Sequence, residues 1–312
     1  MNVTDPLFQL SHSVVRFVCM DASGNESAGT GYLFEFCNDG INHVPCIVTN
    51  RHLVNDAVSG FFTLTRAKDD GSADVGNYEV IHLPRLQDVV IGHPDGSVDL
   101  VAIVITSVLR RAIADKKLYF YVTLRRQDVA DDALLSTLSP IEDVVVIGHP
   151  TSLWDARHNM PVVRRGITAS HARLPWNGRP EFLIDAACFP GASGSPVFLA
   201  NRTMPGHPPG GTAPGTRMAL LGTLWGGPAL TREGNVVTAG ARAGTQPVAA
   251  DAVPMNLGFV IQVAALTALE DEIRKIRDSL FRKPQHATAR SRNSPCVCGS
   301  GKRYKECCGV IL

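Results

Sequence analysis

Short apolar runs, separated by turn-forming residues, dominate the chain from residue 10 to residue 262. Runs such as SVVRFVCM, GTGYLFEF, PCIVTN and DVVVIG are rich in Val, Ile and Phe, with Gly, Pro or Asp between them. This length and spacing are typical of β-strands in barrels and sandwiches. About a dozen such runs exceed what one small barrel holds, so the sequence predicts an all-β fold with two barrels or sheets.

Positive and negative side chains are nearly equal in number, so the net charge of the chain does not attract it to nucleic acid or to a membrane. Its 312 residues include 30 Lys and Arg against 29 Asp and Glu, a formal net charge of +1. We therefore expect no sequence-specific binding to nucleic acid. No apolar stretch is long enough to cross a bilayer, and the N-terminal sequence lacks the basic start and apolar block of a secretory signal. These features predict a cytoplasmic protein with no transmembrane segment.

A helical pattern replaces the strand pattern near residue 262. Apolar residues recur there at spacings of three and four, at Leu266, Leu269, Ile273, Ile276 and Leu280. This predicts an amphipathic helix over residues 266–283. Only about two heptads fit, which favours packing on the β domain over a coiled-coil dimer.

The helix divides the predicted domains. We expect a β domain over residues 1–265, a polar linker over 284–295 and a small tail domain over 296–312. Within the β domain, residues 202–217 and 226–251 are rich in Gly, Pro and Ala and are predicted to form long surface loops.

The run FPGASGSPVF, residues 189–198, has the features of a nucleophile loop. Ser193 lies between Gly191 and Gly194, and glycines permit the unusual backbone angles of a tight loop. They also leave backbone N–H groups uncovered, so that these can face a developing oxyanion. Taken alone, the run could equally be an ordinary Gly/Ser turn.

Two further motifs place a histidine and a carboxylate at strand ends. His52 follows the apolar run in CIVTNRHLV, a position that holds a general base firmly at a cleft. Asp99 in DGSVDLVAIVI precedes a continuous apolar strand, and a buried acid there needs a partner such as the histidine of a Ser–His pair. Asp95 is the alternative, but it lies in a DG turn that suits a solvated carboxylate.

The three motifs occur in the order His, Asp, Ser, with separations of 47 and 94 residues. In this order and spacing the chain resembles the trypsin-like, chymotrypsin-fold serine peptidases. TNRH, DLVAI and GASGSP are similar to the three catalytic motifs of that family. VVIGHP, RRGIT and LIDA resemble bacterial members close to the heat-shock high-temperature-requirement proteases. The resemblance covers residues 10–265 and implies two six-stranded β-barrels.

The resemblance also implies a mechanism. Ser193 would be the nucleophile, His52 the general base and Asp99 the group that orients the imidazole. The backbone N–H groups of Gly191 and Ser193 would form the oxyanion hole. Residue 192 is Ala where secreted relatives carry an aspartate that pairs with a freed N-terminus, so no activation by zymogen cleavage is implied.

A substrate-binding region follows from the same resemblance. The segment Leu224, Trp225 and Gly226 looks like the strand that binds substrate backbone. Ala187 falls at the base of the specificity pocket, with Gly226 and Gly258 as its walls. None of these residues supplies a charge, so we expect cleavage after small or medium apolar residues rather than after Lys or Arg.

Four cysteines crowd into the tail sequence PCVCGSGKRYKECCG, residues 295–309. Thiolates at Cys296, Cys298, Cys307 and Cys308 can close a tetrahedral shell around a structural Zn²⁺ ion. A tail this short has no core in which to bury them otherwise. The run closely resembles the SEC-C zinc motif of the bacterial preprotein translocase motor, with Cys308 where that motif often has His. In that family the motif is an interaction module.

The tail is also basic, with seven Lys or Arg against one acidic residue between Arg282 and Glu306. Such a stretch can be a solvated linker or can dock on an acidic partner, for which we consider protein, ribosomal RNA and anionic lipid, with protein favoured.

Two functions from different classes fit the whole sequence. One is an intracellular serine endopeptidase that its zinc tail directs to a partner. The other is a catalytically silent trypsin-like domain that acts as a binding module or adaptor. The complete His, Asp and Ser set favours the endopeptidase.

Overall fold

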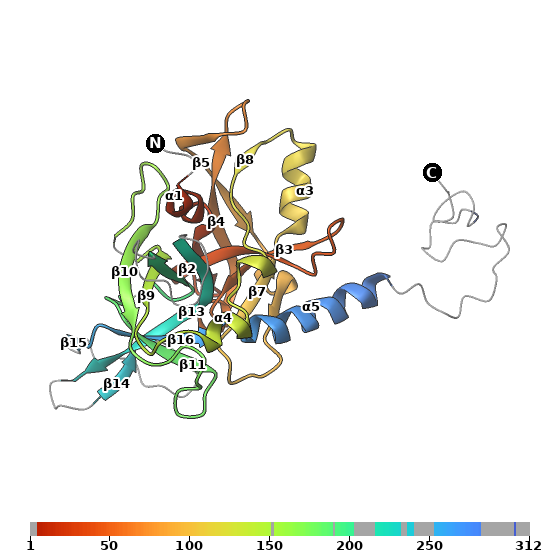
Figure 1. Ribbon diagram of the computed structural model, residues 1–312. Helices are drawn as coiled ribbons and strands as arrows, with labels where there is room; N and C mark the ends of the chain where they lie inside the picture. The colour runs from red at the N-terminus through yellow and green to blue at the C-terminus, as the bar shows by residue number, and fades with distance from the viewer. Residues whose placement is uncertain are drawn as a thin grey trace. The chain divides into compact units, whose positions relative to one another are not determined.

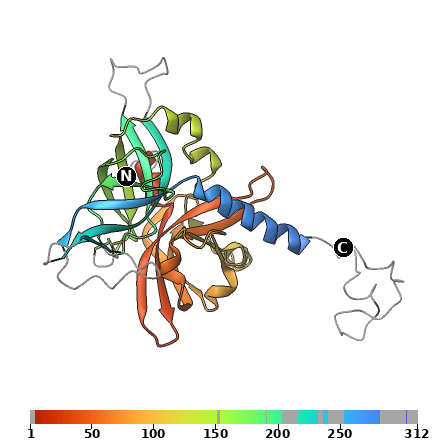
Figure 2. The same cartoon turned by 90° about the horizontal axis from the view of Figure 1, so that it is seen from below.

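Two eight-stranded β-sheets organise the fold of the computed structural model (Figures 1 and 2). The structure describes residues 5–150, 153–189, 191–202, 216–231, 236–239, 253–281 and residue 303. The chain divides into two units, residues 1–273 and residues 274–312, and both sheets belong to the first. The predicted linker and the four tail cysteines lie outside the described residues.

The first sheet is built from the N-terminal strands, red to yellow in Figure 1, in the order β5-β4-β1-β2-β3-β7-β6, with β8 paired to β4. All of its printed pairings are antiparallel, so each strand can bury one face. Its strands are β1 (Val14–Asp21), β2 (Glu26–Phe36), β3 (Val44–Thr49), β4 (Ala57–Ala67), β5 (Ala73–Leu83), β6 (Val90–Gly92), β7 (Val101–Val104) and β8 (Tyr119–Phe120). Phe17 and Phe62 stack in its core with ring centroids 6.3 Å apart.

The second sheet closes on itself. Its strands are β9 (Asp143–Gly148), β10 (Val162–Thr168), β11 (Glu181–Asp185), β12 (Pro196–Arg202), β13 (Thr216–Leu230), β14 (Val236–Ala239), β15 (Val253–Pro254) and β16 (Leu257–Gln262). Because β12 pairs with both β9 and β13, the path β12-β9-β10-β11-β16-β13 forms a six-stranded barrel. The predicted all-β fold with two barrels or sheets is confirmed.

The loop prediction for residues 226–251 is wrong in part. β13 continues to Leu230, where β14 and β15 pair with it on either side. The Gly- and Pro-rich composition disfavours strand formation, but pairing with an existing strand outweighs such a local preference. Residues 240–252 lie outside the described part of the chain.

Short helices connect the strands, and a longer one follows the barrel. They are α1 (Pro6–Ser11), α2 (Arg51–Val54), α3 (Thr106–Ala114), α4 (Asp132–Ser136) and α5 (Ala265–Phe281), with 3₁₀ turns η1 (Leu86–Val89) and η2 (Arg126–Asp128). The predicted C-terminal helix is therefore confirmed as α5. Leu266, Leu269 and Ile273 on α5 are buried in the core of the first unit. None of the helices in the described ranges is long and apolar enough to cross a membrane.

The two sheets share one core, and polar side chains bond across it. The apolar cluster joins residues of β2 and β3 to residues of β9, β11, β12 and β13. Within it, the hydroxyls of Tyr32 on β2 and Thr223 on β13 lie 2.9 Å apart and are buried. Buried polar groups of this kind fix the position of one sheet against the other, because leaving either unpaired costs free energy. The loops that carry His52, Asp99 and Ser193 meet at this junction.

Candidate active site

His52 and Asp99 come together because their strands are neighbours. β3 and β7 are antiparallel, with Thr49 opposite Val101, so the end of β3 lies beside the start of β7. His52 follows β3 within α2, and Asp99 precedes β7. The backbone N–H of His52 donates to Asp99 Oδ1 at 2.9 Å, and His52 Nδ1 lies 2.6 Å from Asp99 Oδ2.

The carboxylate of Asp99 is buried, and a hydrogen bond to the backbone carbonyl of the same residue holds Asp99 in place. Its side chain is 5% exposed, whereas that of His52 is 14% exposed. Asn50 Nδ2 donates to the Asp99 carbonyl oxygen at 2.8 Å. With Nδ1–H directed at the carboxylate, Nε2 of His52 is the ring nitrogen left to exchange a proton.

Asp95, the alternative carboxylate, has a local role. It accepts hydrogen bonds from the N–H and the hydroxyl of Ser97, at 2.8 and 2.7 Å. These bonds hold the pKa of the Asp95 carboxyl below its ordinary value. Asp95 therefore closes an exposed turn, and Asp99 is the acid in contact with His52.

A second histidine–carboxylate pair shows what distinguishes the first. His158 Nδ1 lies 2.7 Å from Asp155 Oδ2, almost the same distance as in the His52 pair. Its members are three residues apart in a turn, and their side chains are 42% and 49% exposed. Solvent weakens such an exposed pair. Burial, and not the bond length, sets His52 and Asp99 apart.

The loop of Ser193 is bonded to both sheets. Ser193 O accepts from Thr30 N of β2 at 2.9 Å, and Gly194 N donates to Leu224 O of β13 at 2.8 Å. Thr49 Oγ1, at the end of β3, donates to Thr30 O at 2.7 Å. Through Thr30, the loop of Ser193 and the strand end that leads to His52 are held together.

Gly194 permits this close approach. Its φ is +87°, and a Cβ built on it would lie 1.8 Å from Thr30 O and 2.6 Å from Thr49 Oγ1. Any side chain there would force the loop away from β2. The glycine that the sequence places one residue after Ser193 is therefore required for the two sheets to meet at this point.

The hydroxyl of Ser193 donates to the carbonyl oxygen of Trp225 at 3.1 Å. Among the described residues it makes no hydrogen bond to His52. Catalytic hydrogen bonds are often long or differently aligned in the absence of substrate. A rotation about the Ser193 χ1 angle would release the hydroxyl from Trp225 O.

Gly191 and Ser193 offer free backbone donors. In the part of the chain that the structure describes, their N–H groups donate to no other residue. Gly191 has a φ of +85°, and its carbonyl is turned to Thr30 Oγ1, which donates to it at 3.1 Å. Two uncovered N–H groups beside a serine hydroxyl can bind a negatively charged oxygen.

The buried residue His149 supports the Thr30 contact to the Ser193 loop from the core between the two sheets. The N–H of His149 donates to Thr30 Oγ1 at 2.8 Å, the same hydroxyl that donates to Gly191 O. Burial, with a smaller contribution from Arg16, lowers the pKa of His149 to about 3, so its imidazole is neutral at physiological pH. Its ring meets Trp154 edge to face, with centroids 5.8 Å apart.

The predicted substrate-binding residues lie on β13 and β16. Leu224 and Trp225 are buried, and Trp225 stacks on Phe259 with ring centroids 5.3 Å apart. Gly226 is paired with Phe259 across the two strands, and the register shifts between Leu224 and Gly226. Gly258 precedes Phe259 on β16, so the two predicted glycine walls lie near each other.

Cys188 packs against Gly258, together with Leu224 and Ile184. A Cβ on Gly258 would lie 2.6 Å from Cys188 Sγ, so the thiol occupies space that only a glycine leaves open. Burial raises the pKa of Cys188 to about 12, which keeps the thiol neutral. Ala187, predicted as the base of the pocket, has an exposed side chain, and its carbonyl accepts a hydrogen bond from Arg164. Neither Cys188 nor Arg164 is among the site residues predicted from the sequence.

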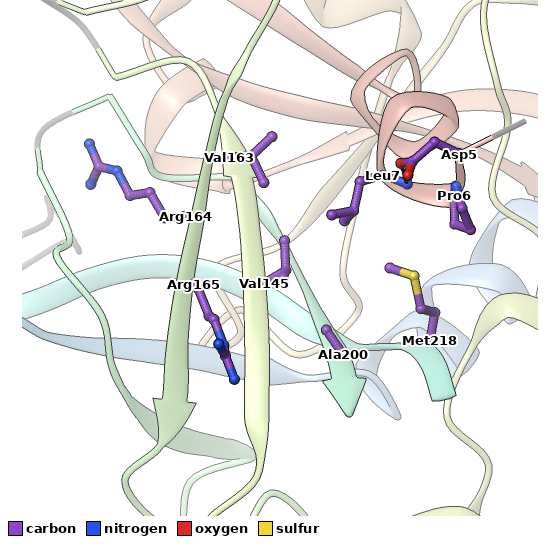
Figure 3. Close-up of a pocket in the computed structure, with 9 residues that line it drawn as sticks. All are labelled: Asp5, Pro6, Leu7, Val145, Val163, Arg164, Arg165, Ala200 and Met218. Carbon is purple, nitrogen blue, oxygen red and sulfur yellow. Dashed lines mark hydrogen bonds between the residues drawn. The ribbon is translucent and has the colours of Figure 1, made fainter. Parts of the chain in front are cut away.

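A separate cavity of about 430 Å³ lies between α1 and strands β9, β10, β12 and β13 (Figure 3). It is lined by Asp5, Pro6, Leu7, Val145, Val163, Arg164, Arg165, Ala200 and Met218. None of the predicted site residues lines it. Within the described ranges, no group of three or more His, Cys, Asp or Glu side chains could hold a metal ion.

Comparison with known proteins identifies two parts of the chain. The trypsin-like peptidase domain family matches residues 29–206, and the SEC-C motif matches residues 292–309. The SecA protein translocase subunits of Heliobacterium modesticaldum and Desulfotalea psychrophila are 62% and 50% identical to the chain over 34 residues. These matches cover 11% of this chain and 4% of each translocase subunit.

Two solved structures that are similar to the chain serve for comparison. The active form of the Rv3671c protease from M. tuberculosis is 17% identical, with 87% of this chain and 85% of that one covered and a TM-score of 0.46. HL collagenase is 14% identical, with 88% and 96% covered and a TM-score of 0.43. The family match covers more than half of the chain. The chain therefore belongs to the trypsin-like peptidases, a family of serine protease hydrolases.

Proposed function

We propose that the chain is an endopeptidase that cleaves peptide bonds through a covalent acyl-enzyme on Ser193. The observation that carries this is the buried His52–Asp99 pair, with its bonds of 2.6 and 2.9 Å, held through Thr30 at the loop of Ser193. A buried carboxylate that fixes the imidazole from the Nδ1 side leaves Nε2 to act as general base.

The proposed reaction has two halves. Ser193 Oγ leaves Trp225 O and attacks the scissile carbonyl while His52 Nε2 takes its proton. His52 then gives this proton to the departing amine as the C–N bond breaks. Water next attacks the acyl-enzyme, with His52 as base, and Ser193 recovers its proton. Asp99 stays ionised throughout and stabilises the imidazolium.

The N–H groups of Gly191 and Ser193 are the proposed oxyanion hole. They are uncovered and fixed in place before substrate arrives, so they need no reorganisation as charge develops on the carbonyl oxygen. Loss of one donor of this kind costs about 10²–10³ in kcat.

The proposed substrate has a small or medium apolar residue before the scissile bond. Cys188 adds a neutral thiol to the uncharged set formed by Ala187, Gly226 and Gly258. None of these can pair with a Lys or Arg side chain, and burying an unpaired cation is costly.

Peptide-library digestion tests both the activity and this preference. Mass spectrometry should find cleavage after Val, Ala, Leu or similar residues, little cleavage after Lys or Arg, and none with Ser193→Ala. Ala187→Asp should suppress the apolar preference, because it adds a carboxylate where Ala187, Gly226 and Gly258 supply no charge. A wild-type profile dominated by Lys or Arg would show that the pocket is formed by other residues.

A silent binding domain is the second candidate function. The hydrogen bond from Ser193 Oγ to Trp225 O favours it, because this orientation directs the nucleophile away from His52. In that case the cleft would hold a peptide without cleaving it. Covalent labelling of Ser193 separates the two candidates.

We propose that the SEC-C motif binds one structural Zn²⁺ ion through Cys296, Cys298, Cys307 and Cys308. The donor set fits, because four thiolates satisfy a tetrahedral Zn²⁺ ion and leave no open position for chemistry. A cytoplasmic location would keep these thiols reduced and available. The tail's excess of Lys and Arg suits docking on an acidic partner, for which we favour a protein.

Removal of the tail should leave the peptidase chemistry intact. Truncation after Arg282 should remove the bound zinc, weaken capture of a partner and leave short-peptide hydrolysis within about twofold of full length, because few contacts cross a polar linker. A Cys307→Ser/Cys308→Ser variant or a chelator should act like the truncation, since metal binding supplies the folding energy of so small a unit. The metal content of each protein reports on the tail, and its rate of short-peptide hydrolysis reports on the peptidase domain. Full-length protein without zinc, or hydrolysis that stops with chelator, would contradict this assignment.

A further inference from the structure

Two adjacent arginines on β10 point in opposite directions. Successive residues of a strand face opposite sides of a sheet. Arg165 Nη2 donates to Asp143 Oδ1 at 2.9 Å on the surface, where the Arg165 side chain is 75% exposed. In Figure 3 the Arg164 side chain leaves β10 on one side and those of Val163 and Arg165 on the other, and all three residues line the cavity of about 430 Å³.

Arg164 reaches the segment that leads to Ser193. Its Nη1 donates to the carbonyl oxygen of Ala187, and its Cζ lies 4.7 Å from the centroid of the Phe189 ring. One guanidinium thus holds the segment twice, through a hydrogen bond to the backbone and a cation–π contact with a side chain. Arg164 also lines a small cavity together with Ala187 and Ala192.

Arg164 has no acidic partner among the described residues. Burial lowers its pKa, since a cation with few water contacts is destabilised. A partly buried cation without a counter-charge is a cost to the fold, so the contacts that it makes must offset that cost. Both of those contacts go to the segment before Ser193.

Among the described residues, the segment has few other polar anchors, and the one at its end is Thr30 Oγ1, which donates to Gly191 O at 3.1 Å. Ala186 N donates to Asn256 O before it, and Gly194 N donates to Leu224 O after it. Between them, the Ala192 N–H donates to Phe189 O within the same turn, which does not tie the turn to the barrel. Ala192 itself offers no charge or hydrogen-bonding side chain. The hydrogen bond from Arg164 to Ala187 O is the polar contact between the barrel and residues 187–189 in the described part of the chain.

We propose that Arg164 is a positioning residue that holds Ala187 and Phe189, and thereby the start of the Ser193 loop, so that the N–H groups of Gly191 and Ser193 converge on the oxyanion. This inference rests on the proposed function of Ser193. The printed contacts of Arg164 go to Ala187 and Phe189 and not to His52 or Ser193, so its proposed action is through the loop. Its loss should therefore lower kcat, which depends on the oxyanion donors, far more than it raises KM.

Arg164→Met and the matched control Arg165→Met test the proposal. Met retains the apolar stem and removes the guanidinium. With a peptide of the preferred apolar class, Arg164→Met should lower kcat by about 10- to 100-fold, the range expected when catalytic donors are displaced by about 1 Å. KM should stay within about threefold, and a peptide boronate, which forms a tetrahedral adduct, should bind weaker by the same factor as kcat falls. Arg165→Met should leave all three values near wild type.

Amide hydrogen exchange and the Phe189→Leu variant separate the anchoring role of Arg164 from the proposed catalytic function. Hydrogen exchange of the amides in residues 186–195 should rise in Arg164→Met and not in Arg165→Met, whether or not the wild type hydrolyses peptide. If wild type fails to cleave but exchange follows this pattern, the proposed function fails and the anchoring role survives. Phe189→Leu removes the exposed ring beneath the guanidinium and does not depend on a buried substitution. It should lower kcat by a smaller factor and add little to Arg164→Met, since both act on one contact.

A kcat for Arg164→Met equal to that of wild type would overturn the proposal. So would an equal loss in Arg165→Met, a loss confined to KM, or unchanged amide exchange in the loop. If Arg164→Met does not fold, Phe189→Leu decides: wild-type kcat and wild-type exchange in that variant would also overturn it.

Discussion

Ser193→Ala and His52→Ala should each reduce peptide turnover to near background, a loss of about 10⁶-fold, and the double variant should be hardly slower than either single variant. The nucleophile and its base act as one unit. A serine hydroxyl without a base is a poor nucleophile, and an imidazole without the serine has no hydroxyl from which to take a proton. Once one is lost, the other contributes little. Single-turnover rates on a peptide of the preferred class measure all three variants.

The chain offers a matched control for each change. Ser195 lies two residues after Ser193, and its buried hydroxyl has no hydrogen-bond partner among the described residues, so Ser195→Ala should keep full activity. His158 forms the exposed pair with Asp155, and His158→Ala should likewise leave turnover unchanged. Losses that add up in the Ser193/His52 double variant would show that the two residues do not share one chemical step.

Asp99→Asn should lower kcat by about 10⁴-fold with little change in KM. The amide can still occupy the site, but its NH₂ group opposes Nδ1–H and favours the imidazole tautomer with the proton on Nε2. That tautomer cannot accept the proton of Ser193. The ratio of kcat in the variant to kcat in wild type measures the effect.

Asp95→Asn is the control for Asp99. Its carboxylate is bonded to Ser97 in an exposed turn and does not contact His52, so activity should not change. Full activity in Asp99→Asn, or a large loss in Asp95→Asn, would assign the third catalytic role to another residue.

The short apolar runs between turn-forming residues predicted a fold built from β-strands, because such runs have to bury apolar side chains. The resemblance to trypsin-like peptidases implied that Asp99 orients His52. His52 and Asp99 lie at the end of one strand and the start of another. When those strands proved to be antiparallel neighbours, the two side chains met.

Side-chain orientation and long-range contacts were outside the reach of the sequence. Whether Ser193 Oγ bonds to Trp225 O or to His52 depends on the Ser193 rotamer, and the spacing of motifs along the sequence does not predict a rotamer. The approach of Cys188 to Gly258 depends on how two segments distant in the sequence pack, which no motif in the sequence indicates. The two consecutive arginines of β10 were the available signal for Arg164, since strand alternation requires one of them to face inward.

The extension of β13 shows a different limit. Composition predicted loops over residues 226–251, yet β13 runs to Leu230 and pairs with β14 and β15. A glycine- or proline-rich segment gains strand structure when a partner strand is already in place. This effect comes from tertiary structure, which a local window of sequence does not contain.

Labelling with a fluorophosphonate probe tests the central claim most directly, because the probe reacts only with a serine activated as a nucleophile. Mass spectrometry of the digested wild-type protein should find a single adduct, on Ser193. The adduct should be absent in Ser193→Ala, strongly slowed in His52→Ala and Asp99→Asn, and unchanged in Ser195→Ala. A folded wild-type protein that forms no adduct on Ser193, or a label that persists in Ser193→Ala, would contradict the account and favour a silent binding domain.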